Sequence, residues 1–158
     1  MASYWFALHH LLHSADLVED ALRRRLSRTG VGPRQARVID ALARMEPTSQ
    51  VALARAFGLG AAAMSTMTAR LIEAGYVSRE TNPKEARANL LRLTDEGRAL
   101  LTDIHAAWLD IDRLIEGAIG VGPAVELAGH ARALRDALGG RAPGTVPDIE
   151  TSTEGTKT

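Results

Sequence analysis

The 158-residue chain contains no cysteine. Disulfide bonds, thiolate metal sites and redox sensing through a thiol are therefore excluded. Aromatic residues make up only 4% of the chain, while alanine, leucine and arginine are abundant, and this composition favours helix over sheet. Lysine is scarce as well, because Lys84 and Lys157 are the only two. The basic side chains are therefore almost all arginines, which suit forked contacts with phosphate groups.

The chain also lacks net charge, long apolar runs and the marks of a signal peptide. Its formal charge at pH 7 is zero, so attraction to nucleic acid would have to come from a local basic surface. It has no run of about eighteen apolar residues, and we therefore expect no contact with a membrane. The apolar start YWFALHHLL has no basic segment before it and no small-residue cleavage site after it. We expect a cytoplasmic protein.

Catalytic motifs are missing from the sequence too. It has no glycine-rich phosphate loop after a strand, no nucleophile elbow and no spaced pair of carboxylates that suggests a cleft. Ser65 has no evident base to activate it. We therefore expect no catalytic residue, no cofactor and no enzymatic activity.

The most informative stretch of the chain runs from Leu53 to Leu93. A short helix that starts near Thr48 or Ser49 and ends by Phe57 is followed by a glycine-containing turn and a second helix. A charged hairpin comes next, with the turn at Asn82-Pro83. The second helix is predicted over 61–74 and the strands over 76–81 and 88–93. This order of elements is that of a winged helix-turn-helix, and it predicts a mostly α protein with a small β-wing.

Long helices with apolar seams flank this unit. Helices are predicted over 4–27 and 33–45, and Thr94 is the expected cap of a third. The third helix carries apolar residues in heptad spacing: Leu101, Ile104, Trp108, Ile111, Ile115 and Ala118. A last helix repeats the pattern at Leu127, Ala131, Leu134 and Leu138.

The flanking helices carry more apolar surface than a small winged-helix domain could cover. We therefore predict that they pair with each other and with a second copy, and the alternative is a monomeric helical bundle. This divides the chain into an N-terminal dimerisation helix at 1–32, a DNA-binding domain at 33–98, C-terminal dimerisation helices at 99–138 and a disordered tail at 139–158.

Four phrases of the sequence, in this order and at this spacing, resemble the MarR (multiple antibiotic resistance regulator) family: QARVIDALA, LARAFGLG, MTARLIEAGYVSR and NPKEARANLLRLTDEGRALL. The resemblance covers residues 4–138. It implies a triangular homodimer that binds double-stranded DNA, with the helix at 61–74 in the major groove and the tip of the wing in the minor groove. It also implies a repressor that is released by a small ligand, often an aromatic or phenolic one.

The predicted recognition helix has a small, hydroxyl-bearing outer face. If Met64 faces the core, a helical wheel places six residues on or beside the opposite face, and we predict that these contact DNA: Ala62, Ala63, Ser65, Thr66, Ala69 and Arg70. Arg70 is suited to a phosphate contact or to a pair with Glu73. Many relatives have serine where this chain has Gly60, and charged side chains at positions 61, 66 and 69. Modest specificity, or reading of DNA shape, is therefore expected. The alternative is an ordinary solvated surface.

The wing is predicted to add basic contacts. Lys84 and Arg87 are assigned to DNA, and Arg87 is the candidate for insertion into the minor groove. The resemblance aligns Glu85, Ala86 and Arg87 with an Asp-Arg-Arg wing motif, so the first arginine is missing here. Arg79 and Glu85 are predicted to pair and to support the wing. Arg92 and Arg98 are interpreted as solvated charges, with a phosphate contact as the alternative.

A ligand pocket is predicted where the dimerisation helices meet the DNA-binding domain. Its candidate lining is Trp5, His9, His13 and Trp108, together with Tyr4. His9 and His13 stand four residues apart, a spacing that can hold a metal ion. No further ligand pattern completes a site, so no metal is assigned. Interfacial histidines and ordinary core tryptophans are the alternative.

Three functions remain open at this point. The leading hypothesis is a homodimeric repressor that binds a pseudo-palindromic operator and is released by a small, possibly aromatic effector. A metal-responsive regulator of the same fold is the first alternative. The second is a winged-helix dimer that acts through protein contacts without reading DNA, since the predicted recognition helix has little charge.

Overall fold

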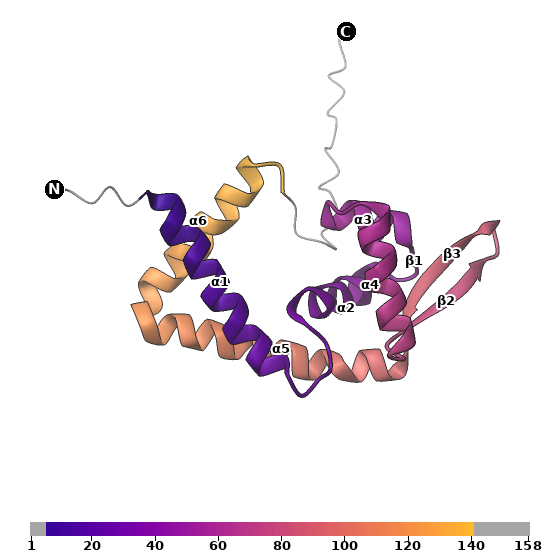
Figure 1. The fold of residues 1–158 in the computed structure, drawn as a ribbon, viewed down its shortest axis with the longest axis horizontal. Coiled ribbons are helices and arrows are strands. Elements are labelled where there is room, and N and C mark those ends of the chain that lie inside the picture. Colours follow the sequence, from indigo (N-terminus) through magenta and orange to yellow (C-terminus); the bar gives the residue numbers. More distant parts are fainter. Residues whose placement is uncertain (1–5, 141–158) are drawn as a thin grey trace, which may run out of the picture.

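The computed structural model describes residues 6–84 and 89–140 in full and residues 85–88 by their backbone. This part of the chain forms six helices and a three-stranded sheet (Figure 1), so the predicted mostly α fold with a small β-wing is confirmed. The elements in order are α1 (Ala7–Leu26), α2 (Pro33–Met45), β1 (Thr48–Ser49), α3 (Gln50–Phe57), α4 (Ala61–Glu73), β2 (Val77–Asn82), β3 (Glu85–Leu93), α5 (Asp95–Ile119) and α6 (Val121–Ala137).

Side-chain caps fix the starts of two helices, as the sequence predicts. The hydroxyl oxygen of Ser49 accepts the N–H of Ala52 at 3.1 Å at the start of α3. Thr94 does the same for the N–H of Gly97, also at 3.1 Å, at the start of α5. Each cap satisfies a donor that the first helical turn leaves without a partner. α3 ends at Gly58, whose φ of +61° is a left-handed conformation suited to glycine.

The sheet has the strand order β1-β3-β2, and both pairings are antiparallel. β2 and β3 form the wing, with Val77 opposite Leu93 at its base and a register shift between Thr81 and Asn82 near its tip. β3 begins at Glu85, three residues before the predicted strand. β1 pairs Thr48 with Leu91. The sequence analysis treated β1 as a helix cap only, because a two-residue strand leaves no periodic pattern.

The core lies between α2, α3, α4, the sheet and the first half of α5. Its largest fully buried apolar side chains are Leu26, Val38, Ile39, Leu42, Leu53, Met64, Leu71, Leu91 and Ile104. α5 packs unusually closely on this unit at Gly97, because a Cβ there would lie 2.1 Å from the carbonyl oxygen of Tyr76. Only glycine therefore allows the first turn of α5 to sit against the base of the wing.

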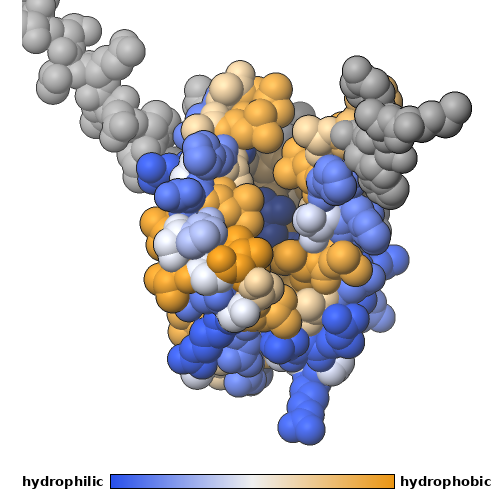
Figure 2. All heavy atoms as spheres, turned by 90° about the vertical axis from the view of Figure 1, so that its left-hand side faces the viewer, coloured by the Kyte–Doolittle hydropathy of each residue, from blue (hydrophilic) through white to orange (hydrophobic). Residues whose placement is uncertain are grey.

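The terminal helices are largely exposed. α1 buries only Ala21 and Leu26, and no residue of α6 is buried. The two helices lie beside each other at the end of the molecule opposite the wing (Figure 1). Figure 2 shows this end, where apolar surface surrounds a hollow. An apolar groove of about 400 Å³ lies between α1, α5 and α6, with Leu11, Val18 and Ile115 among its lining residues.

No single helix among the described residues is long and apolar enough to cross a membrane. α3 and α4 taken together pass a test of length and hydropathy, but they are bent by 114°. Leu53 of α3 and both Met64 and Leu71 of α4 are fully buried in the protein core, so this bent pair is accounted for by the helix-turn-helix.

Candidate nucleic-acid interface

α4 has one buried face and one exposed face. Met64, Thr68 and Leu71 are buried, and Met67 is half-buried. The six residues predicted to contact DNA are all exposed: Ala62, Ala63, Ser65, Thr66, Ala69 and Arg70. Figure 1 places α4 beside the wing, so this helix and the β2–β3 hairpin belong to one side of the molecule. An exposed helix of this length next to a two-stranded ribbon has the dimensions of a major-groove reader with a minor-groove arm.

The outer face of α4 carries few fixed polar contacts. The hydroxyl of Thr66 donates to the carbonyl oxygen of Ala62 at 3.1 Å, which leaves its oxygen lone pairs available to an outside donor. Arg70 forms no ion pair with Glu73 or with any other residue of the described part. Of the two roles that the sequence left open for Arg70, the intrahelical pair is therefore not formed.

The wing is held by a different pair from the predicted one. Arg92 Nε donates to Glu80 Oε2 at 3.0 Å across the two strands. Glu80 lies opposite Leu90 in the register, so this is a diagonal cross-strand pair. Arg92 is still a solvated charge with a 41% exposed side chain, but the sequence does not predict its partner, because alternation along β3 does not show which position on β2 lies within its reach. Arg79 and Lys84 are exposed.

The side chains of Glu85 and Arg87 lie outside the described residues. The predicted pair of Arg79 with Glu85 and the predicted minor-groove role of Arg87 therefore stay predictions. The backbone of the turn is described, and there Lys84 N–H donates to Asn82 Oδ1 at 2.9 Å. This local bond orders the tip of the hairpin, which is the part that would enter a groove.

Glu46, at the end of α2, ties the base of the wing to α5. Its side chain is only 9% exposed, and it accepts the N–H of Leu93 at 2.7 Å and forms an ion pair with Arg98. Arg98 is exposed, as the sequence predicts, and it also forms this ion pair. Glu46 could not be predicted from the sequence, because its partners are 47 and 52 residues away in the chain and no local pattern links them.

A second buried carboxylate joins α2 to α5. Asp40 is 8% exposed, and its Oδ1 lies 2.7 Å from Nε2 of His105. Its other oxygen pairs with Arg44 one turn along α2. The imidazole of His105 also lies against Trp108, with 5.5 Å between the ring centroids. Asp40 and Glu46 therefore fix the α5 helix, which carries the C-terminal seam, to the DNA-binding unit.

The predicted ligand pocket is only partly within the described residues. Tyr4 and Trp5 lie outside them. His9 and His13 are exposed on α1, whereas Trp108 is half-buried against the core. None of these three lines the groove between α1, α5 and α6. In the part of the chain that is described, no group of three or more histidine or acidic side chains could hold a metal ion.

Residues of the helix-turn-helix and the wing match a known protein family. A model described as the MarR family matches residues 29–88. Residues 29–88 form a MarR-family domain. The resemblance predicted from the sequence is thereby confirmed for the segment from the α1–α2 turn to the start of β3. A search of curated proteins gave no match.

Solved structures extend the likeness to the terminal helices. MepR of S. aureus in complex with DNA has a TM-score of 0.75 at 11% identity, covering 84% of this chain and 98% of that one. CouR, a transcriptional repressor bound to a 23-mer duplex, gives 0.76 at 21% identity, covering 82% and 92%. A mutant MarR of E. coli with operator DNA gives 0.72 at 23% identity, covering 83% and 93%. The MarR-family domain and this shared fold together support a DNA-binding transcription regulator.

Proposed function

We propose that the chain is a homodimeric transcription repressor that binds a pseudo-palindromic operator and is released by a small ligand. The observation that carries the proposal is the exposed, nearly uncharged outer face of α4 beside the wing, in a fold that three DNA complexes share. The alanines permit close approach to base edges and the thymine methyl group. Ser65 and Thr66 supply hydrogen-bonding groups, and Arg70 is positioned at the edge of the face for a phosphate contact.

The wing supplies the electrostatic part of the proposed interface. Lys84 is exposed at the turn, and Arg87 follows in the first residues of β3. We assign Lys84 to a phosphate and Arg87 to the minor groove, where a narrow groove concentrates negative potential. With a net charge of zero, such local contacts would have to supply the affinity for DNA.

The proposed homodimer is supported by the surface of the terminal helices. Several apolar side chains of α1 and α6 are about half exposed, among them Leu8 at 57%, Leu12 at 54% and Leu127 at 49%. Contiguous apolar surface of this kind marks an interaction site in a folded protein. A two-fold dimer would place two copies of α4 about 34 Å apart, which is one turn of the duplex. The effector site stays a prediction at the place where the dimerisation helices meet the DNA-binding domain, with Trp5, His9, His13 and Trp108 as its candidate lining.

The test is a binding experiment with DNA enriched from a random duplex library by repeated rounds of binding to the protein. Fluorescence anisotropy would compare the enriched duplex with a scrambled one at two salt concentrations. We expect tighter binding to the enriched duplex and a marked loss of affinity at the higher salt concentration. Failure to enrich any sequence, or equal affinity for both duplexes, would overturn the proposal and favour a protein-interaction role.

Arg87→Ala isolates the wing in the same assay. We expect about tenfold weaker binding and a salt dependence reduced by roughly one phosphate contact. Arg113→Ala is the matched control because it removes the same charge from a side chain that is 75% exposed near the far end of α5. Equal losses in the two variants would assign the effect to general charge and not to the wing.

A further inference from the structure

A buried contact joins the two helices of the helix-turn-helix. Thr68 on α4 is 1% exposed, and its Oγ1 donates to Oε1 of Gln50, the first residue of α3, at 3.0 Å. We infer that Gln50 and Thr68 are positioning residues that set the orientation of α4 and thereby the discrimination between operator and other DNA, without contacting DNA themselves. This inference rests on the proposed function, because it assigns the two residues a part in DNA reading.

Thr68 does not need Gln50 in order to satisfy its hydroxyl group. The hydroxyl also lies 2.9 Å from the carbonyl oxygen of Met64 in the preceding turn. The hydroxyl of Thr66 donates to a local acceptor of this kind, the carbonyl oxygen of Ala62, at 3.1 Å. A threonine in a helix therefore has a local acceptor available. Because the hydroxyl has a single proton, donation to Gln50 Oε1 takes the place of the local bond and joins two helices. Its effect is therefore on where α4 lies.

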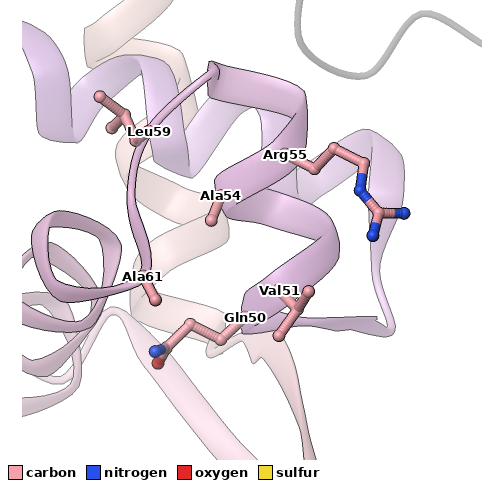
Figure 3. Close-up of a pocket in the computed structure, with 6 residues that line it drawn as sticks. All are labelled: Gln50, Val51, Ala54, Arg55, Leu59 and Ala61. Atoms are coloured by element: carbon pink, nitrogen blue, oxygen red, sulfur yellow. The ribbon is translucent and has the colours of Figure 1, made fainter.

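Gln50 connects α4 to the wing as well as to α3. It follows directly after β1, whose residue Ser49 pairs with Leu90 on β3. Figure 3 shows the Gln50 side chain extending from the first turn of α3 toward α4, while Arg55 on the same helix points away. One amide side chain therefore relates the position of α4 to the strand that carries the wing. The positions of α4 and of the wing, the two elements proposed to contact DNA, are therefore both linked to Gln50.

An open pocket borders the start of α4. A cavity of about 230 Å³ lies beside Gln50 between α3 and the start of α4, lined by Gln50, Val51, Ala54, Arg55, Leu59 and Ala61. Gly60 provides no side-chain cap for α4. Met64 and Leu71 anchor α4 in the core, but its first turn has no side-chain cap and borders this open pocket. The hydrogen bond between Gln50 and Thr68 therefore contributes to the orientation of α4.

A small change in the angle of α4 would affect base contacts more than phosphate contacts. Productive recognition requires side chains to be held within about 0.5 Å and 10–20° of the correct geometry. Ser65 and Ala69 lie within one turn of Thr68 on α4 and would shift with any rotation about it. Long, flexible side chains on phosphates tolerate such a shift, so affinity for unrelated DNA should persist while discrimination falls.

The test compares operator and scrambled duplexes for Gln50→Met, Thr68→Val, the double variant and Thr68→Ser. We expect each of the first two to lower the ratio of the two affinities about tenfold, with the affinity for scrambled DNA unchanged. The double variant should lose no more than either single one, because both break the same contact. Thr68→Ser keeps the hydroxyl and should restore most of the ratio. Thr102→Val, at an exposed position of α5, is the control for loss of a hydroxyl group.

The outcomes separate this inference from the proposed function. Thermal melts first establish that each variant is folded, and Thr68→Val, which conserves volume, decides alone if Gln50→Met does not fold. A wild-type protein without preference for the enriched duplex overturns the proposed function and this inference together. A wild type with preference, and a Thr68→Val variant with the same ratio, overturns this inference only. Losses that add in the double variant would also overturn it.

Discussion

The apolar side chains are mostly buried in the segment from α2 to β3 but largely exposed in the two terminal helices, α1 and α6. In the first, leucines such as Leu42, Leu53 and Leu71 are fully buried. In the second, leucines at helical spacing remain about half exposed, as Leu11 and Leu127 do at 50% and 49%. Both regions have strong helical periodicity, so periodicity shows only that a face is apolar. What covers that face, the same chain or another one, is a separate question.

Polar contacts differ between the two regions in the same way. Asp40, Glu46 and Thr68 are largely buried, and each is bound to residues of another element. The ion pairs of the terminal helices are mostly short-range and exposed, as between Arg23 and Glu19 at 3.0 Å. Buried, fully bonded groups restrict geometry because an unsatisfied alternative is costly. Exposed ion pairs restrict the geometry of the fold much less.

The largest expected effect comes from emptying the core. Leu71→Ala removes a fully buried side chain from α4 and should lower the free energy of unfolding by about 2–5 kcal/mol. Leu109→Ala, at a position on α5 that is 55% exposed, should change it by roughly 0.5 kcal/mol or less. Urea denaturation followed by circular dichroism measures both. A large loss for Leu109→Ala would show that its side chain is covered in solution.

A charge on the α6 seam should break the proposed dimer instead of the fold. Leu134→Glu places a carboxylate where an apolar contact is expected, and we expect the dimer dissociation constant to rise about a hundredfold. Analytical ultracentrifugation measures this constant. Ala133→Glu introduces the same charge about 100° around α6 from Leu134, outside the seam, and should leave this constant almost unchanged. Similar behaviour of both variants would exclude the seam as the interface.

The sequence predicts best what is local. The caps at Ser49 and Thr94 and the two faces of α4 follow from spacing within a few residues, and the structure has all of them. It predicts poorly which polar groups meet across the fold. Glu46 binds Leu93, which is 47 residues away in the chain, and Gln50 binds Thr68, which is 18 residues away. Hydropathy does not distinguish one buried polar pair from another. The DNA contacts of α4 and the wing depend on a partner molecule and remain predictions.

The smallest expected effect compares two carboxylates. Glu46→Gln removes the charge that Arg98 pairs with, at a side chain that is 9% exposed, and should lower the free energy of unfolding by about 1–3 kcal/mol. Glu19→Gln makes the same change at a side chain that is 49% exposed on α1, and roughly 0.5 kcal/mol or less is expected.

The double variant with Arg98→Gln tests the cause of the Glu46 effect. If the pair carries the loss, Arg98→Gln in the Glu46→Gln background should cost little more, and the coupling energy should be about 1 kcal/mol. If the two losses add, the ion pair does not carry the loss, and the weaker acceptor that the amide of the Glu46→Gln variant offers to Leu93 N–H is the remaining cause. Urea denaturation of the four proteins gives the cycle. Either result measures how strongly this contact joins α5 to the DNA-binding unit. It bears on the terminal helices because α5 packs on that unit with its first half and carries the C-terminal seam.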